Sequence, residues 1–476
     1  MKTFRAALLA GMALAAAPAA LAEDLRSALI SAYNTNPQLQ AARAQQRALD
    51  ETVPIEKADA LPSVSASATH TEVLDKTDLL GPGRILQGSV SAGVPIYAGG
   101  GIRNSIRAAE TRVEAGQADL RGAESAIFSQ VVAAYTGVLL NQSIVGLNRK
   151  NVEVLTVNLR ATRDRFEIGD LTRTDVAQSE ARLAIARGDT QSAEANLIAA
   201  REQFIQVVGK VPVDLQAPPP LPGLPENVAD AERVALESNP DLIAARERSK
   251  ASGFDIDAAA ASRLPRVEVF TGASMTDYYG TLAGGSAAAS QKNGGVTAGV
   301  RASIPLFQGG RPAALKRQAQ ARAAATLENE IAAEREVIAQ LRAAYSSWRA
   351  ANQIVVSTQT AVDAAALSLE GVRAENSVGN RTILDILNAE QELLQARVRL
   401  VTAQRGAYVA GFTLLAAMGK AEARDLALDG GALYDPQANY DRVRGKIFDW
   451  DDDQDPAAQS TRTVDTPAQD GSIPGQ

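Results

Sequence analysis

The sequence contains no cysteine, and this absence removes several classes of protein at once. Disulfides, thiolate metal sites and thiol nucleophiles are excluded, as is the lipid-bearing cysteine of a bacterial lipoprotein. Histidine is almost as scarce: His70 is the single example, which argues against a histidine-based metal cage or catalytic triad. Aromatic residues make up only 4% of the 476 residues, few for a large globular core. We therefore expect no catalytic, cofactor or metal site.

Positive charge is also in short supply. The chain has 48 Lys and Arg against 55 Asp and Glu, a net charge of −7, which argues against nucleic acid as a partner. Residues 1–22 contain Lys2 and Arg5, a short apolar run and an Ala-x-Ala site, which is typical of a cleaved export signal. No later run of about 18–20 apolar residues stands out, so we expect no transmembrane helix in the mature chain.

The most informative feature that the sequence does contain is an internal duplication. Asn36-Pro37 recurs 203 residues later as Asn239-Pro240, and VPIYAGG at 94–100 recurs 210 residues later as IPLFQGG. A period this long indicates two structural repeats rather than a solenoid. The predicted divisions are an export signal at 1–22, a first repeat at 23–210, a proline-rich linker at 211–226, a second repeat at 227–420, a further segment at 421–446 and an acidic tail, disordered by composition, at 447–476.

Each repeat contains one very long helical stretch, 102–167 in the first and 312–377 in the second. Apolar residues recur along both with a seven-residue period, which is typical of a left-handed coiled coil, although an ordinary helical bundle is an alternative. Such a helix is about 100 Å long. Two shorter helices of about 55 Å stacked end to end would match it. The shorter helical stretches lie at 24–60, 172–208, 227–263 and 382–418.

Four runs alternate apolar residues with small or polar ones, at 63–73, 89–97, 266–275 and 296–306. Runs of about 9–11 residues can cross an outer membrane as tilted strands, and this alternation is typical of a membrane barrel. A soluble four-stranded sheet on a helical stalk is the alternative. Four strands cannot close by themselves, so a barrel needs two chains with eight strands or three chains with twelve. The pattern favours an oligomer without choosing between these numbers.

Together, the signal, the duplication, the two Gly-Gly motifs and the segment SVGNRTILDILNAEQELL at 377–394 resemble the TolC family of outer-membrane efflux proteins. The resemblance covers about residues 24–446. It implies an α+β fold in which a homotrimer forms a 12-stranded transmembrane β-barrel, with four strands per chain, in the outer membrane of a Gram-negative bacterium. It also implies that a long α-helical coiled-coil barrel continues into the periplasm, with residues 421–446 packed at its equatorial region.

The resemblance further implies a gate at the inner end of the helical tunnel, made of acidic residues and an arginine-centred bond network. By motif, these roles fall on Asp385 and Arg381 in the second repeat and on Asp175 in the first. Asn376 and Asn388 stand where the family often has Tyr and a second Asp. One inner acidic residue per subunit predicts moderate cation selectivity and a weaker gate than two would give. The alternative is that Asp385 is simply an exposed helix residue.

The two helix turns at 168–172 and 378–382 are the implied contacts with a periplasmic adaptor protein. The residues concerned are Gly169, Asp170, Leu171, Gly379 and Asn380. A simpler interpretation is that the glycines are helix caps that need a positive φ. Both interpretations can hold, because a cap at the tip is also what a partner meets.

The sequence thus predicts a non-enzymatic exit duct that receives cargo from an adaptor and an inner-membrane pump, either an ABC transporter or a proton-driven pump. Tyr434-Asp435-Pro436 and Asn439-Tyr440-Asp441 resemble the family's type I protein secretion branch and favour polypeptide cargo. A multidrug efflux pump is the alternative, and one duct could serve both. A periplasmic coiled-coil adaptor or an exported enzyme fits less well. Nothing in the sequence names the cargo, the pump or a role for the tail.

Overall fold

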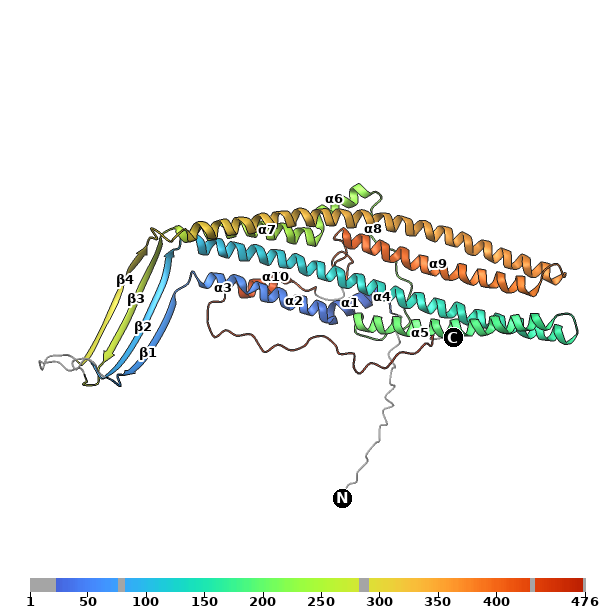
Figure 1. The fold of residues 1–476 in the computed structure, drawn as a ribbon, viewed down its shortest axis with the longest axis horizontal. Coiled ribbons are helices and arrows are strands. Elements are labelled where there is room, and N and C mark those ends of the chain that lie inside the picture. The colour runs from blue at the N-terminus through green and yellow to red at the C-terminus, as the bar shows by residue number, and fades with distance from the viewer. Residues whose placement is uncertain (1–22, 76–81, 282–290, 429–432, 474–476) are drawn as a thin grey trace, which may run out of the picture.

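The computed structural model describes residues 23–75, 82–281, 291–428 and 433–473, so the predicted export signal lies outside the described residues. The molecule is elongated, with a β-sheet at one end and two helical hairpins that reach toward the other end (Figure 1). The helices and strands follow one another in the same order in both halves, in agreement with a two-fold internal repeat. The long helical stretches and all four strands are present where the sequence predicts them, with small differences at their ends.

The first half comprises α1 (Leu25–Thr35), α2 (Pro37–Asp50), α3 (Thr52–Ala58), β1 (Ser63–Glu72), β2 (Arg84–Tyr97), α4 (Gly101–Glu167) and α5 (Arg173–Val208). The second half comprises α6 (Val228–Ser238), α7 (Pro240–Ala260), the 3₁₀ turn η1 (Ala261–Arg263), β3 (Arg266–Asp277), β4 (Lys292–Ser303), α8 (Arg311–Ser377) and α9 (Ile383–Ala417). The short helix α10 (Pro436–Val443) follows.

The long helices α4 and α8 each contain 67 residues, which corresponds to about 100 Å. Both begin directly after a glycine with positive φ, Gly100 at 81° and Gly310 at 80°, where the chain turns sharply out of the sheet. The helices α7 and α9 both contact α4 and α8, and α9 ends where α7 begins. Short helices stacked end to end therefore match a long helix, as the predicted lengths require.

The predicted continuous helices at 24–60 and 227–263 are wrong, because both are interrupted at their Asn-Pro pair. Proline lacks an N–H and forces the preceding residue out of the helical region. Asn36 then caps α2, accepting hydrogen bonds from the backbone N–H groups of Gln38 at 2.9 Å and Leu39 at 3.3 Å. Its Nδ2 also donates to the carbonyl of Val207 at the end of α5, at 2.9 Å.

Asn239 repeats this arrangement in the second half. It caps α7 through the N–H groups of Asp241 and Leu242, and its Nδ2 donates to the carbonyl of Ala417 in α9 at 3.0 Å. Each asparagine therefore joins the last turn of one helix to the first turn of the next. We call these two points the helix junctions, and the belt of the molecule around them the equatorial region.

The four strands form one antiparallel sheet in the order β1-β2-β3-β4, so β1 and β4 are its edges among the described residues. One face is apolar and open to the surroundings, with Val296 78% and Val300 67% exposed. The other face carries small polar residues, including Ser67 and Ser89, whose hydroxyl oxygens lie 2.8 Å apart. The apolar face and both edges of this sheet require covering that one chain does not provide.

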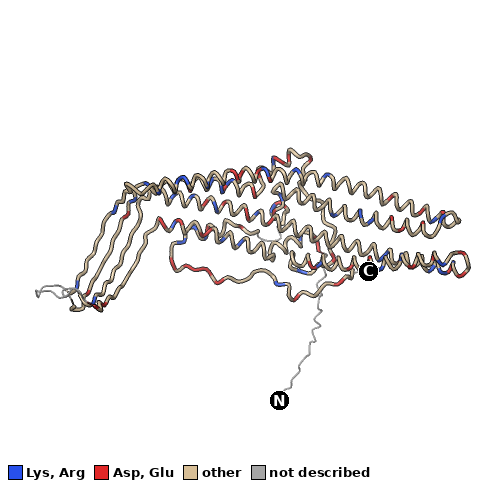
Figure 2. The backbone as a smooth tube through the Cα atoms, in the orientation of Figure 1, with Lys and Arg blue, Asp and Glu red and all other residues tan. Residues whose placement is uncertain are grey.

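Charged residues are confined to the ends of the four strands (Figure 2). In β3, for example, Arg266 and Glu268 lie at one end and Asp277 at the other, with none at 269–276. In β4 the charged residues are Lys292 and Arg301. The middle of the sheet is therefore a band without charge, as a bilayer requires of the strands that cross it.

The helix α4 also contains one stretch that is long and apolar enough to cross a membrane, which the sequence analysis did not anticipate. Half of that stretch is buried inside the molecule. Buried residues of α4 such as Phe128 and Tyr135 pack with Phe204 of α5 and Phe412 of α9 in the largest described core cluster. The stretch is therefore explained by the core of the equatorial region.

The segment after the second repeat packs beside the first. Val443 of α10 is fully buried, and Asn439 of the same helix donates to the carboxylate of Asp50 in α2 at 2.7 Å. Residues 447–473 contain no helix or strand, yet part of this tail runs alongside α5 and bonds to it (Figure 1). This differs from the disordered tail that the composition predicts, because arginine side chains of the helices satisfy the tail's backbone carbonyls.

Candidate functional site at the hairpin tips

The turns between the long and the return helices form the end of the molecule that is farthest from the sheet (Figure 1). Gly169 and Gly379 have φ values of 81° and 84°, so a side chain at either position would be strained. The N–H groups of Asp170 and Asn380 bond back to the carbonyls of Arg165 and Glu375, at 2.9 Å in both turns. The two glycines are therefore helix caps, as the simpler interpretation predicts, and the turns are largely exposed to solvent in one subunit.

The return helices α5 and α9 begin with the same capping box. The Oδ2 atom of Asp175 accepts from the N–H of Thr172 at 2.9 Å and from its hydroxyl at 2.7 Å, while Asp385 accepts from Thr382 at 2.9 and 2.8 Å. These bonds hold the pKa of both carboxyl groups below the ordinary value. Both carboxylates are therefore ionised at neutral pH and committed to starting a helix.

The charges around the two capping boxes are arranged in opposite senses. In the first turn, the helical Arg165 pairs with Asp170 at 2.7 Å. In the second turn, the helical residue is the acid Glu375, and Arg381 is its partner at 2.6 Å. Within one subunit, Arg381 thus donates to Glu375 rather than to Asp385, although both carboxylates raise its pKa.

The two departures from the family pattern have definite contacts. Asn376 donates through Nδ2 to the carbonyl of Arg381 at 2.6 Å, which ties the last turn of α8 to the turn residue. Asn388 accepts from Nη2 of Arg182 at 2.8 Å, so it links α9 to α5 across the two hairpins. The preceding residue, Leu387, packs among leucines of the first hairpin, including Leu183. The structure therefore places Asn388 at the contact between hairpins within the subunit.

Sequence reasoning missed several residues of these tips. Arg163 pairs with Glu180 at 2.6 Å, and Arg373 pairs with Glu390 at the corresponding place of the second hairpin. Both pairs are separated by 17 residues and are related by the 210-residue period, which is the signal that could have found them. Glu375 and Arg182 had no such signal, because their counterparts Arg165 and Glu392 carry the opposite charge.

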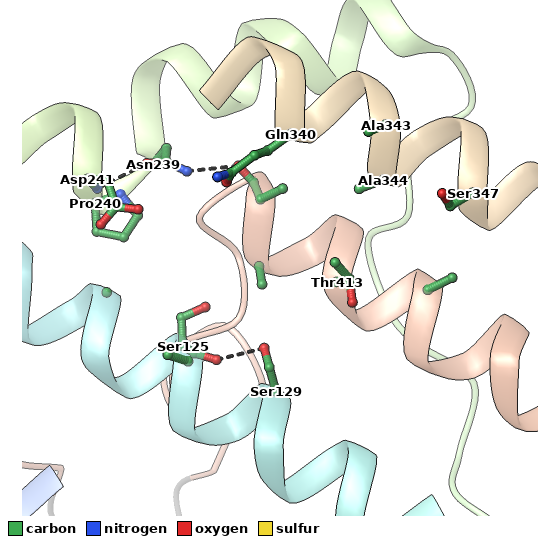
Figure 3. A pocket seen from close by; sticks show the side chains of 15 residues that line it. Ser125, Ser129, Asn239, Pro240, Asp241, Gln340, Ala343, Ala344, Ser347 and Thr413 are labelled. Atoms are coloured by element: carbon green, nitrogen blue, oxygen red, sulfur yellow. Dashed lines mark hydrogen bonds between the residues drawn. The ribbon is translucent and has the colours of Figure 1, made fainter. Parts of the chain in front are cut away.

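A hollow of about 550 Å³ lies elsewhere, at the second helix junction (Figure 3). Ser125 and Ser129 of α4 line it opposite Gln340 of α8 and Thr413 of α9, and the start of α7 lies at one side. Thr413 lies about 200° around α9 from Gly411, which faces the linker. The hollow therefore opens on the face of the helical layer that the linker leaves uncovered.

The residues that line this hollow are mostly small and uncharged. Its polar groups are hydroxyls, amides and the carboxylate of Asp241, whose pKa is raised chiefly by desolvation and further by Asp119, against the effect of Arg248. No histidine or cysteine lines it, and no group of three or more metal-binding side chains occurs among the described residues. Alanine side chains stand between the hydroxyl groups, so most of the lining is small and apolar.

The chain is similar to known proteins in family, in sequence and in structure. The chain matches the family described as outer membrane efflux protein over residues 28–210 and 233–420, which takes in both repeats. It is 34% identical to the outer membrane efflux protein BepC of Brucella suis biovar 1 (strain 1330), over 93% of this chain and 95% of the relative. It is 25% identical to the outer membrane protein TolC of Escherichia coli (strain K12), over 87% and 86% of the two chains.

Two further similarities bear on function and fold. The alkaline protease secretion protein AprF of Pseudomonas aeruginosa (strain PAO1) is 27% identical over 60% of this chain and 59% of that relative. A solved structure of CusC superimposes with a TM-score of 0.72 at 18% identity, over 84% of this chain and 92% of the other, and so supports the fold alone.

A four-stranded sheet with open edges, a charge-free band and a long helical body define one subunit of an outer-membrane channel that several chains complete. The chain belongs to the outer membrane efflux protein family. The resemblance to TolC, the trimeric fold with twelve strands and a helical barrel, and the location in the outer membrane of a Gram-negative bacterium are confirmed. Members of this family are channels rather than enzymes, and they work with a periplasmic adaptor and an inner-membrane pump.

Proposed function

We propose that this channel is the exit duct of a type I secretion system and passes polypeptides from an inner-membrane pump to the outside. The observation that supports polypeptide cargo is the segment at 434–441, which resembles the secretion branch of the family and is part of the folded equatorial region. The guanidinium of Arg43 lies over the ring of Tyr434, 4.9 Å from the ring centre. The backbone N–H of Tyr434 donates to the hydroxyl of Tyr33 at 2.8 Å. AprF, a relative named as an alkaline protease secretion protein, supports the same cargo.

The hairpin tips are proposed as the gate of the duct. In a trimer, three copies of Asp385 would converge on the axis, attract cations and repel one another. Arg381, Glu375 and Asn376 would hold the second turn in its closed position through the bonds described above. Asp175 would contribute one carboxylate per first turn, and the bond from Arg182 to Asn388 would set how far the two hairpins separate.

The exposed turns are proposed as the adaptor contact. Gly169, Asp170 and Leu171 in the first turn, with Gly379 and Asn380 in the second, lie at the end opposite the sheet (Figure 1). Their position supports a partner that approaches from the periplasm. The energy for transport would come from the pump. This pump would be an ABC transporter in a type I secretion system and a proton-driven pump in a multidrug efflux system.

The test compares proteins in the medium of cells with the gene, without it and with the gene restored, at equal density and with lysis measured. We expect one or a few proteins to leave the medium and accumulate inside cells that lack the gene. An unchanged medium, at conditions where the gene is expressed, would contradict the secretion proposal.

Efflux of small toxic molecules is the second candidate, because BepC, the relative with 34% identity over nearly the whole chain, is named an efflux protein. Growth of the same three strains in a panel of dyes, detergents and antibiotics tests it. Hypersensitivity with unchanged secretion would assign the channel to efflux, and both effects together would show a duct shared between pumps.

A further inference from the structure

The tail residues 470–472 contact the first hairpin through their backbone. Arg201 of α5 donates from Nη1 to the carbonyl of Asp470 at 2.6 Å and from Nη2 to the carbonyl of Ser472 at 2.7 Å. Arg149 of α4 donates to the carbonyl between them, that of Gly471, at 3.0 Å. Three consecutive carbonyls are thus held by two arginines from two helices. The Arg201 side chain is only 7% exposed, so the tail supplies the acceptors that this buried charge needs.

The contact also restricts which residues the tail can carry at these positions. A Cβ atom added at Gly471 would lie 2.8 Å from the Cβ of Glu194, so no larger residue fits there without movement. The carboxylate of Asp470 accepts from the N–H of Ser472 at 3.1 Å and from its hydroxyl at 2.6 Å, which shapes the bend that meets the helices. Ile473 then packs against the core cluster of the equatorial region.

The corresponding place on the second hairpin differs from this site on the first. Under the 210-residue period, Arg149, Glu194 and Arg201 correspond to Gln359, Gln404 and Gly411, so the second hairpin lacks both arginines. A Cβ at Gly411 would lie 2.9 Å from Leu221 of the linker, which occupies the corresponding place with an apolar side chain. The linker that follows the first repeat covers the second, and the tail that follows the second repeat covers the first.

We propose that α4 and α5 form a binding site for a bent peptide carrying Asp-Gly-Ser-Ile, and that the tail's own residues 470–473 are its ligand, a separable latch that completes the equatorial region. The latch continues to the first helix junction, where a Cβ at Gly209 would lie 2.9 Å from the hydroxyl of Thr461. It is independent of the cargo, because its residues lie on neither the hairpin tips nor the hollow of Figure 3.

The first experiment uses the full chain as a purified trimer in detergent. Trypsin cleavage after the exposed Arg462 is followed over time in the original protein, in Gly471→Ala and in the control Ala458→Ser, which alters an exposed tail residue. We expect cleavage of Gly471→Ala to be at least about fivefold faster, because opening a docked segment limits proteolysis. Equal cleavage of all three proteins would overturn the latch.

The second experiment tests binding in trans. A chain that ends at residue 456 is titrated with a fluorescein-labelled peptide of residues 457–476, and fluorescence anisotropy measures its affinity. We expect saturable binding that weakens at least about tenfold with Arg201→Leu in the protein or Gly471→Ala in the peptide, and does not weaken with Arg187→Leu, a control on the exposed face of α5. Absence of binding at about 100 µM peptide, or equal affinity of the two peptides, would refute the site. If the shortened chain does not fold, the proteolysis of the full chain decides.

Discussion

The two hairpin tips have the same backbone and opposite charges. Each has a positive-φ glycine, a Thr-x-x-Asp capping box and an arginine–glutamate pair 17 residues apart. At the turn itself, the first tip pairs a helical arginine with Asp170, whereas the second pairs Glu375 with Arg381. Since backbone conformation and helix starts allow few residue types, these positions stayed alike after duplication, while exposed charges were free to diverge. The positions that differ, including Glu375 and Arg381, are where the two turns can respond differently.

The largest effect is expected where the two halves do not differ, at the helix junctions. Replacing Asn239 by Ala removes the cap of α7 and leaves the carbonyl of Ala417 without its donor, which we expect to lower the free energy of unfolding by about 2–3 kcal/mol. Asn36→Ala should have a similar effect, since its bonds are the same. Denaturant unfolding of trimers in detergent measures both.

The exposed Asn34 is a matched control for this measurement. Asn34→Ala should change stability by no more than about 0.5 kcal/mol, because no capping or junction bond involves its side chain among the described residues. If Asn239→Ala proves as mild as Asn34→Ala, the junction is held by packing of its neighbours and not by the asparagine.

The sequence was most informative where local chemistry is decisive. The turn glycines, the capping residues and the strand alternation each follow from backbone geometry, and the duplication doubled every signal. The helices at 24–60 and 227–263 were predicted as continuous although Asn36-Pro37 and Asn239-Pro240 were already recognised as a repeated motif. Their role required knowing that α5 and α9 end beside them, which is a tertiary contact that no local pattern contains.

The position of the proposed gate residues at the tip could be predicted from the sequence, but their bonds could not. Arg381 and Asp385 do lie at the tip, but the acid that accepts from Arg381 is Glu375, six residues away on the preceding helix. A residue's partner in an exposed ion pair depends on side-chain conformation and not on sequence spacing alone. The tail was predicted as disordered for a related reason: its few apolar residues gave no sign that two arginines would bind its backbone.

The second prediction contrasts the two capping carboxylates. Asp385→Ala and Asp175→Ala each remove one capping box, so both should affect their own helix start to a similar degree. If Asp385 alone lies on the inner ring, only Asp385→Ala should reduce the preference for cations over anions, measured as a reversal potential in planar bilayers under a salt gradient. Unchanged conductance and ion preference in Asp385→Ala would show that this carboxylate is an ordinary exposed helix residue.

The pH dependence of that preference sharpens the same contrast. Hydrogen bonds from Thr382 hold the pKa of Asp385 below its ordinary value of 3.8, so its charge and its capping contribution are present above that value and are lost as the pH falls through the lowered pKa. We expect the cation preference to be the same at about pH 7 and pH 5. A loss already at pH 5 would mean that repulsion among three converging carboxylates outweighs the bonds from threonine.

A smaller effect is expected from the opposed turn charges. Arg381→Ala releases Glu375, which should loosen the second turn and increase single-channel conductance, whereas Asp170→Ala should act on the first turn only. Both pairs are exposed, so the differences should shrink at high salt, where charges are screened beyond about 3 Å. Equal conductance of Arg381→Ala and the original channel at low salt would remove Arg381 from the proposed gate.

The smallest effect should come from Asn388, where the two hairpins meet. Asn388→Asp would turn the bond from Arg182 into a charge-assisted one and add a second acidic residue per subunit near the tip. Because the pair is exposed, we expect a coupling of less than about 1 kcal/mol in a double-mutant cycle with Arg182→Gln, and a modest decrease in conductance. If Asn388→Asp lowers conductance equally with and without Arg182, the new carboxylate acts on the passing ions. If the decrease requires Arg182, the substitution acts by holding the hairpins together, and the gate is set by their separation.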